Sequence, residues 1–348
     1  MNILAIETSC DETSAAVVKD GTEVLSSIIS SQNDFHAKYG GIVPEIASRK
    51  HIESISPVIK EAMERAAIGF KDLDAIATTF GPGLPGSLIV GLSAAKAISF
   101  ALKKPLIGVN HLEGHIYANF LLEPKLKFPF ICLIVSGGHT QLVKVTGHME
   151  FETLGRTRDD AAGEAYDKVA RFLGLGYPGG PIIDKLAKTG NENAVNFTRP
   201  MLARQSPGGG GLEEEYKYDF SFSGIKTAVV YYVKKNPPRP LGEGLGVRVD
   251  IAASFQKAVV DTLVEKTIRA AEENSIKTVA IGGGVAANSK LRADMKAACK
   301  NKGIKCIVPP LELCTDNAAM IGCAGYFRYK KGMVADYSLA IESTARIG

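Results

Sequence analysis

The sequence has little of several features that mark particular classes of protein. Its six cysteines form no Cys-x-x-Cys pair, so neither a structural zinc site nor a disulfide framework is expected, and the thiols should be reduced and mostly buried. The longest purely apolar runs, such as Phe130–Val135, are far shorter than the ~18 residues that a membrane-spanning helix needs. The N-terminus has no basic region followed by an apolar segment, so a secretory signal is not expected. We therefore expect a cytoplasmic protein without a membrane segment.

Net charge is also small. The formal net charge of +4 permits binding to RNA but does not favour it, because proteins that bind nucleic acids usually concentrate their positive charge in one patch. The chain is 45% hydrophobic and 22% charged, which is typical of soluble globular proteins. Its 348 residues exceed the ~250–300 that one hydrophobic core usually spans. Two lobes are therefore expected.

The hydrophobic pattern predicts an α/β fold. A strand, a turn and a second strand are expected over residues 3–18, and the same pattern returns over residues 130–145. Strand-like and helical segments alternate after each of these hairpins, which indicates an α/β architecture. The repeated pattern suggests an internal duplication. Residues 204–217 and 236–240 are predicted to form surface loops, because glycine, proline and charged residues dominate there.

Two histidines, His111 and His115, form a candidate metal site. Residues four apart on a helix lie about 40° from each other and one turn apart, so both imidazoles can reach one cation. Two surface or capping histidines are the alternative interpretation. Asp316 precedes a helix rich in small residues and is the candidate third ligand. Its alternative role is to cap that helix, and the two roles are compatible.

The segment His111 to His115 also invites comparison with metalloproteases. The zinc-protease motif is His-Glu-x-x-His, with the glutamate at the second position. Here Glu113 is at the third position, roughly 200° around the helix from His111 and so on the face away from a metal. Peptidase activity is therefore a weak alternative.

Three glycine-rich turns follow predicted strands, at residues 135–139, 177–181 and 282–284. Glycine lets backbone N–H groups approach a phosphate closely. One such turn is usually structural, but three of them, together with the turn at residues 7–9, favour a nucleotide site. The third also fits the dinucleotide fingerprint of dehydrogenases. Its place near the end of the chain, and Glu312 lying too far along to bind a ribose, argue against that interpretation.

Acidic residues gather in two places. Asp11 and Glu12 follow the first predicted strand, and Asp160, Glu164 and Asp167 would share one face of a helix. A solvated helix face is the simpler interpretation of the second group. The alternative is a polar wall that receives hydroxyl and amine groups of a substrate.

These motifs, in this order, resemble the universal tRNA threonylcarbamoyladenosine transferase family, in particular its bacterial TsaD branch, formerly called O-sialoglycoprotein endopeptidase-like. The resemblance covers essentially the whole chain, and the ordered series is far more specific than any one motif. Its blocks are residues 6–13, 81–86, 96–115, 135–140, 159–168, 177–181, 220–227, 282–288 and 315–320. The histidine at position 139 resembles the bacterial members of the family. The glycine run at residues 208–211 departs from the family pattern.

The resemblance implies a particular fold. It is a two-lobed α/β fold of the actin, Hsp70 and sugar-kinase type, with duplicated RNase H-like lobes and a cleft between them. Residues 1–128 and 322–348 are expected to form the N-terminal lobe, and residues 129–321 the C-terminal lobe.

The resemblance also implies a reaction and a set of site residues. The threonylcarbamoyl group would move from threonylcarbamoyl-AMP to N6 of adenosine 37 in tRNAs that read codons beginning with A. His111, His115 and Asp316 match the family's metal ligands, and the expected metal is Fe²⁺. The positions that match the adenylate-binding residues are Ile134, Val135, Ser136, Gly137, Gly138, Asp167, Gly180, Asp184 and Asn288.

The expected chemistry is direct acyl transfer. The carbamoyl carbon of the mixed anhydride is already activated, so no enzyme nucleophile is required, and no Ser-His-Asp pattern is seen. Asp11 or Glu12 is hypothesised to orient or deprotonate the incoming amine. Implied partners are tRNA, a paralogous TsaB-like subunit and a small TsaE-like ATPase. A kinase of the same fold and a non-enzymatic partner subunit are alternatives, and the candidate metal ligands argue against both.

Overall fold

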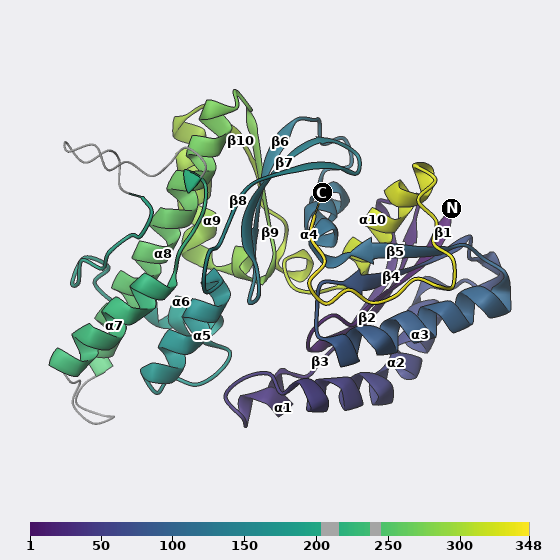
Figure 1. The fold of residues 1–348 in the computed structure, drawn as a ribbon, viewed down its shortest axis with the longest axis horizontal. Helices are drawn as coiled ribbons and strands as arrows, with labels where there is room; N and C mark the ends of the chain where they lie inside the picture. The colour runs from purple at the N-terminus through teal and green to yellow at the C-terminus, as the bar shows by residue number, and fades with distance from the viewer. Residues whose placement is uncertain (203–215, 237–244, 348) are drawn as a thin grey trace. The chain divides into compact units, whose positions relative to one another are not determined.

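The computed structural model describes residues 1–202, 216–236 and 245–347 (Figure 1). The chain forms two compact units. Unit 1 comprises Met1–Lys127, Gly147–Phe151 and Pro309–Gly348. Unit 2 comprises Phe128–Thr146 and Glu152–Val308. The predicted loops at residues 204–217 and 236–240 lie almost entirely outside the described residues.

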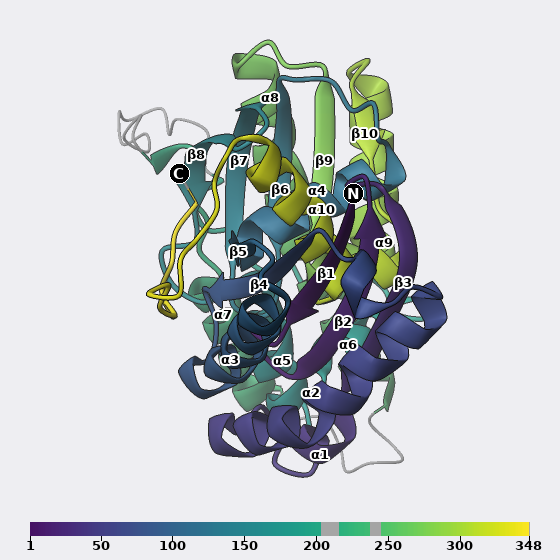
Figure 2. The ribbon, with the colours of Figure 1, turned by 90° about the vertical axis from the view of Figure 1, so that its right-hand side faces the viewer.

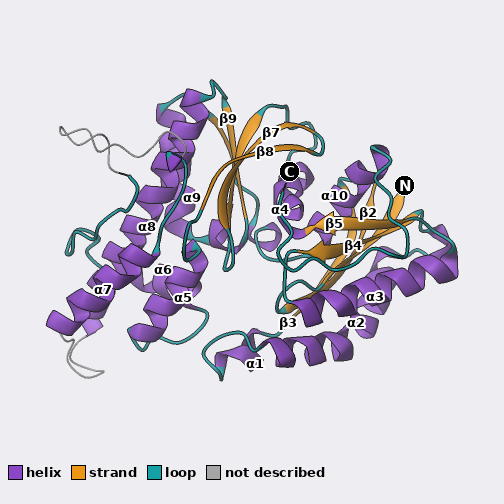
Figure 3. Ribbon diagram, in the orientation of Figure 1, coloured by secondary structure: helices purple, strands orange, loops and turns teal. Residues whose placement is uncertain are grey.

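Each unit is built on a five-stranded sheet, and the two sheets have the same topology (Figure 3). Numbered along the chain within its own unit, each sheet has the strand order 3-2-1-4-5. The first two strands pair antiparallel, and the fourth and fifth run parallel to the first. This repetition confirms the predicted two-lobed α/β fold with duplicated lobes. The predicted cleft between the lobes stays a prediction.

The sheet of unit 1 is buried on both faces along its central strands, as a sheet covered by helices on both sides requires (Figure 2). Helices α2 and α3 pack on one face, and α10 packs on the other together with α4. The strands are β1 (Asn2–Glu7), β2 (Glu12–Lys19), β3 (Glu23–Ser31), β4 (Ala75–Gly81) and β5 (Leu106–Asn110). The helices are α1 (Asn33–Ala37), α2 (Pro44–Ala66), η1 (Phe70–Asp72), α3 (Pro85–Leu102), α4 (His111–Leu122), η4 (Leu311–Leu313) and α10 (Ala318–Lys330).

Glycines let α10 approach the sheet closely. A Cβ atom on Gly322 would lie 2.6 Å from Val18 Cγ2, and one on Gly325 would lie 2.7 Å from Ala77 Cβ. Larger residues at these positions would push the helix away from the strands. The close packing brings the start of α10 to the strand ends of unit 1.

The sheet of unit 2 consists of β6 (Phe130–Val135), β7 (Thr140–Gly147), β8 (Glu150–Arg156), β9 (Thr278–Gly282) and β10 (Lys305–Ile307). Its helices are α5 (Ala162–Phe172), α6 (Gly179–Ala187), α7 (Ser223–Lys235), α8 (Leu245–Glu273), η3 (Gly284–Ala287) and α9 (Ser289–Asn301). The long helix α8 contacts α6, α7, α9 and the central strands β6 and β9. It is therefore the element against which α6, α7 and α9 pack.

The unit boundaries differ from the predicted lobe boundaries at residues 147–151 and 309–321. These residues were assigned to the C-terminal lobe, but they belong to unit 1. For residues 309–321 the physical reason is that α10 packs against α4 and the strands of unit 1, and that Ala318 N in its first turn donates a hydrogen bond to Ser14 Oγ at 2.9 Å. Asp316 therefore lies in the same unit as the two histidines.

Helix α3 is long and apolar enough to cross a membrane by length and composition alone. Core helices of soluble proteins meet the same criterion. In this structure α3 contacts α2 and β4, and its residues Leu88, Leu92 and Ala95 are buried.

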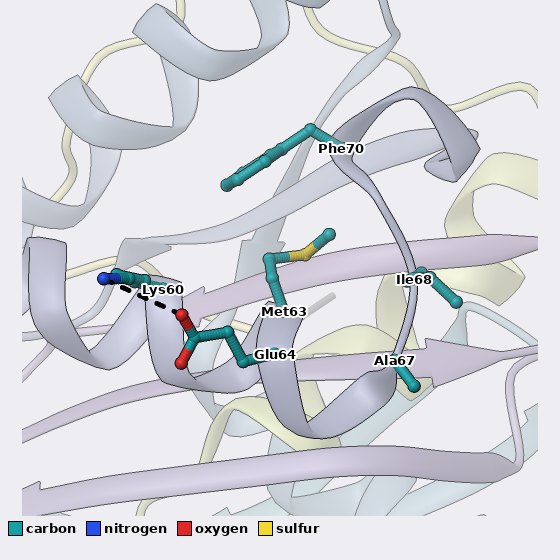
Figure 4. A pocket seen from close by; sticks show the side chains of 6 residues that line it. All are labelled: Lys60, Met63, Glu64, Ala67, Ile68 and Phe70. Carbon is teal, nitrogen blue, oxygen red and sulfur yellow. Dashed lines mark ion pairs between the residues drawn. The ribbon is translucent and has the colours of Figure 1, made fainter.

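A hollow of about 380 Å³ lies where α2 ends, and Figure 4 shows the side chains around it. It is lined by Lys60, Met63, Glu64, Ala67, Ile68 and Phe70. None of these residues belongs to the predicted metal or nucleotide sites.

Candidate functional site

The histidine pair lies at the start of helix α4, directly after strand β5. Asn110 caps the helix, because its side-chain Oδ1 accepts a hydrogen bond from Leu112 N at 2.9 Å. His111 and His115 are therefore one turn apart in the first turns of a capped helix, as the spacing predicts. Both side chains are buried.

Asp316 lies beside both imidazoles. Its Oδ1 is 3.4 Å from His111 Nε2 and 3.3 Å from His115 Nε2. The alternative role of Asp316 as a helix cap is wrong. Asn317 caps α10 instead, since its Oδ1 accepts a hydrogen bond from Met320 N at 2.9 Å. The carboxylate of Asp316 is thus available to the histidines.

The three side chains fit a shared cation. Their ligand atoms all lie within 4.8 Å of one another. Ligand atoms that share one ion at ~2.1 Å are separated by roughly 3–3.5 Å, close to the two distances from Asp316. Both ring nitrogens of His115 are buried without a hydrogen-bond partner among the described residues. A buried polar atom left unpaired is unfavourable, and a bound cation would satisfy Nε2.

Glu7 supports the histidine pair from the end of β1. Its side chain is fully buried, and Oε2 lies 3.1 Å from His111 Nδ1. Oε2 also accepts a hydrogen bond from Thr79 Oγ1 at 2.5 Å. A carboxylate in this position holds the ring so that Nε2 faces the metal position. Sequence reasoning missed Glu7. The available signal was a glutamate ending an apolar strand, since a buried carboxylate needs a partner.

Charges within the cluster shift its pKa values. Burial alone would raise the pKa of Glu7 and Asp316, but the neighbouring His111 lowers both below their usual values. Burial would lower the pKa of His111, but Asp316 and Glu7 raise it well above its usual value. Burial lowers the pKa of His115. Binding of a cation would therefore displace a proton from His111.

Glu113 has a different partner. Both of its carboxylate oxygens accept hydrogen bonds from Arg328 Nη1 on α10, at 2.9 and 3.2 Å. The carboxylate is thus engaged by an arginine rather than by a water next to the histidines. This agrees with the predicted orientation of Glu113, so the peptidase interpretation lacks the glutamate that its motif would use as a general base.

The predicted catalytic acids lie in unit 1 at the start of β2. Burial raises the pKa of Glu12 to about 10, and the negative charges of Asp11 and Asp316 contribute to this rise. Ser31 Oγ donates a hydrogen bond to Glu12 Oε1 at 3.2 Å. A carboxyl group with this pKa is protonated at neutral pH. The catalytic roles of both acids stay predictions.

The first glycine-rich turn of unit 2 connects β6 with β7. Ser136 N donates to His139 O at 2.8 Å, and Gly163 N donates to Ser136 O at 3.2 Å. A Cβ atom on Gly137 or Gly138 would meet nothing within 4 Å. The turn is therefore held from behind by α5 and is open on its glycine side. The same openness is found at Gly180 and Gly284.

The turn after β9 packs directly against the end of β6. A Cβ atom on Gly283 would lie 2.4 Å from Val135 O, and this glycine has a φ of 92°, which other residues rarely adopt. Gly282 pairs with Ile134 in the sheet. The structure thus brings the 134–138 segment and the 282–284 turn together, as expected for parallel neighbours.

The remaining predicted nucleotide residues are joined by hydrogen bonds within unit 2. Gly179 N donates to Asp167 Oδ1 at 2.7 Å, which ties the start of α6 to α5. Ser289 Oγ donates to Asp184 Oδ1 at 2.8 Å, and Asn288 caps α9.

The predicted acidic face of α5 is not formed as expected. Asp160 precedes the helix and accepts from Lys168 Nζ at 2.8 Å and Lys226 Nζ at 2.6 Å. Glu164 pairs with Lys168 at 2.7 Å. Of the three acids, Asp167 is the one that contacts a glycine-rich turn.

Comparison with known proteins identifies the family. The family model described as tRNA N6-adenosine threonylcarbamoyltransferase (TsaD) matches residues 23–323. A protein of that name from Clostridium botulinum (strain 657 / Type Ba4) is 58% identical over 332 residues, which cover 95% of this chain and 94% of that protein. The chain belongs to this family. It is therefore an enzyme of tRNA modification, a threonylcarbamoyltransferase.

Two further members support the same conclusion. The proteins of the same name from Symbiobacterium thermophilum and Clostridioides difficile are 55% and 54% identical, and each alignment covers 97% of this chain. They cover 94% and 95% of those proteins. Membership favours the acyltransferase interpretation over the kinase, dehydrogenase, peptidase and partner-subunit alternatives.

Solved structures share the fold at low sequence identity. Component A of the (R)-2-hydroxyglutaryl-CoA dehydratase of Acidaminococcus fermentans has a TM-score of 0.53 and 17% identity, and the alignment covers 95% of this chain and 98% of that chain. Full-length HypF has a TM-score of 0.61 and 15% identity, covering 95% of this chain and 46% of that chain. At this level of identity the likeness shows the fold alone.

Proposed function

We propose that this enzyme transfers the threonylcarbamoyl group from threonylcarbamoyl-AMP to the N6 amine of adenosine 37, in tRNAs that read codons beginning with A. One observation carries the proposal: in a chain that belongs to this family, the buried His111 and His115 and the partly buried Asp316 lie together as possible metal ligands.

We propose Fe²⁺ as the metal of this group. Two imidazoles and one carboxylate that leave other coordination positions open are a donor set suited to non-haem iron. His111, His115 and Asp316 would hold the ion, and Glu7 would orient His111. When bound, the ion would act as a Lewis acid toward an acyl or phosphate oxygen.

We assign the adenylate to the glycine-rich turns of unit 2. Support comes from the open sides of Gly137, Gly138 and Gly180, where a ligand can approach the backbone. The N–H groups of residues 136–138 would meet the phosphate or acyl end, while Asp184 and Asn288 would serve the adenosine. HypF, which shares the fold, was solved in a phosphate- and nucleotide-bound form.

The proposed reaction requires no nucleophile from the protein, because the carbamoyl carbon is already activated. The N6 amine attacks the activated carbamoyl carbon, AMP leaves with the electron pair of the broken bond, and the amine loses one proton. We propose Asp11 as the acceptor of that proton. Glu12, whose Oε1 accepts a hydrogen bond from Ser31 Oγ, would orient the amine.

We also propose that the enzyme acts in the cytoplasm on tRNA together with a TsaB-like paralogue and a small TsaE-like ATPase. This part of the proposal rests on the family resemblance. Co-purification of the tagged chain with these two proteins from its own cells would test it, and recovery of neither would contradict it.

Mass spectrometry of tRNA nucleosides tests the proposed reaction. Depletion of the protein should remove threonylcarbamoyladenosine from tRNA. Wild-type protein should restore it, and the His115→Ala variant should not. An unchanged level of the modified nucleoside after depletion would refute the proposal.

A further inference from the structure

A buried glutamine connects two of the residues assigned to the adenosine. Gln256 lies on α8 and is 2% exposed. Its Nε2 donates to Asp184 Oδ1 at 3.3 Å, and its Oε1 accepts from Asn288 Nδ2 at 2.8 Å. One side chain from α8 thus bridges α6 and the start of α9.

The bridge determines how Asn288 is oriented. Asn288 Oδ1 accepts from Leu291 N at 3.0 Å, where it caps α9. Its Nδ2 donates to Gln256, so oxygen and nitrogen of the amide each have a definite place. A second N–H of Nδ2 remains for another acceptor.

Asp184 is oriented in the same way. Ser289 donates to it twice, from Oγ at 2.8 Å and from the backbone N at 3.2 Å. Polar contacts thus connect Ser289 to Asp184, Asp184 to Gln256 and Gln256 to Asn288, and the peptide bond between Asn288 and Ser289 closes the ring. We call this the α8 ring.

The chemistry of the α8 ring requires a neutral amide at its centre. The group at position 256 must donate to a carboxylate and accept from an amide. Glutamine does both. A glutamate would repel Asp184, and a methionine of similar size would do neither.

We propose that Gln256 is a positioning residue for the nucleotide, which acts by orienting Asp184 and Asn288 toward an adenine nucleoside. This inference rests on the proposed assignment of the adenylate to unit 2. Because these contacts are prearranged, the nucleotide need not order them when it binds.

Calorimetric titration of the full chain with AMP tests the inference. The Gln256→Met variant should raise the Kd for AMP about 10-fold, because two contacts of the nucleotide lose their fixed orientation. Bound metal, measured by elemental analysis, should be unchanged. In the reconstituted reaction the KM for the adenylate should rise while kcat stays near its wild-type value.

Gln32→Met is the matched control. Gln32 is also a buried glutamine, at 3% exposed, and its amide donates to Ala47 O in unit 1. The substitution removes a buried amide outside unit 2, so the Kd for AMP should stay within about 2-fold of wild type. If Gln256→Met does not fold, as judged by circular dichroism, Gln256→Glu replaces it, with the same expected rise in Kd.

A double-mutant cycle separates positioning from general stability. In the Asp184→Ala/Asn288→Ala background, Gln256→Met should add less than about 2-fold to the Kd, since the groups it orients are gone. An additive effect would overturn the inference, as would a Gln256→Met protein that folds and binds AMP like wild type. If wild-type protein itself does not bind AMP, the assignment of the adenylate to unit 2 fails as well.

Discussion

The two units share one topology but use their first hairpin turns differently. In unit 1 the turn between β1 and β2 holds buried polar side chains, including Thr8, Ser9 and Asp11. In unit 2 the turn between β6 and β7 has Gly137 and Gly138, whose sides are open.

The difference follows from the kind of group that each turn would serve. A transition-metal cation is typically held by imidazole and carboxylate side chains, and burying these requires partners, as in the pair of Glu7 and His111. A phosphate can be met by backbone N–H groups, which need only the absence of side chains. Duplication of a fold thus preserves the strand order while the turns diverge chemically.

The largest expected effect comes from removing a metal ligand in unit 1. His111→Ala or Asp316→Ala should lower bound metal and the rate of tRNA modification together, each by about 100-fold or more. Elemental analysis of purified protein and a reconstituted assay measure the two quantities. Asn288→Ala in unit 2 is the control and should retain the metal. An equal content of bound metal in the His111→Ala and wild-type proteins would contradict the assignment of His111 as a metal ligand.

A smaller effect is expected from Glu7, which supports His111 without being one of the ligands. Glu7→Gln should weaken metal binding by roughly 10–100-fold, because a neutral amide holds the imidazole less strongly than a carboxylate does. Titration of the metal against a competing chelator measures this. Activity should return at high metal concentration. An unchanged metal affinity would show that the Glu7 contact is only structural.

Two glycines of unit 2 should respond differently to the same substitution. Gly138→Val should weaken AMP binding by about 10-fold or more, and by more than Asn288→Ala, which removes polar contacts worth ~0.5–3 kcal/mol. The Gly138→Val variant should keep its fold, because a Cβ atom at position 138 would meet nothing within 4 Å. Gly283→Val should instead lower stability, because its Cβ would lie 2.4 Å from Val135 O. Calorimetry and thermal unfolding compare the two, and intact AMP binding in Gly138→Val would place the nucleotide elsewhere.

The smallest effect concerns a buried charge in unit 2. Lys266 is fully buried and donates to Lys217 O at 2.9 Å. Burial lowers its pKa from 10.5 to about 8. The folded protein therefore binds this proton less tightly than the unfolded chain. The resulting destabilisation is complete below about pH 8 and is relieved as the pH rises toward 10.5.

Lys266→Met should thus stabilise the protein at about pH 7, on the order of 1–3 kcal/mol, and less at about pH 9.5. Urea unfolding at both pH values measures the difference from wild type. The same gain at both pH values would contradict the assigned pKa, and a loss at pH 7 would show that the hydrogen bond to Lys217 outweighs the burial.

The sequence was sufficient to predict those features whose residues lie close together in the chain. The spacing of His111 and His115, directly after an apolar strand, predicts the start of α4 and the pairing of the two imidazoles. The glycine turns were likewise visible, because glycine has few other reasons to follow a strand at such positions. Strand β3 was missed, since its serine-rich sequence lacks a clear apolar pattern, and its partial burial depends on β2 and α2.

The sequence by itself therefore determined the fold class, the candidate metal ligands and the glycine turns, because each of these follows from the types of residue and their spacing. The tertiary structure decided which side chains contact one another. It placed Asp316 in unit 1 and gave the helix cap to Asn317, because α10 packs on α4. It also set Glu7 against His111, and Gln256 between Asp184 and Asn288. Such contacts join segments far apart in the chain, and a buried polar side chain shows its partner only after the chain has folded.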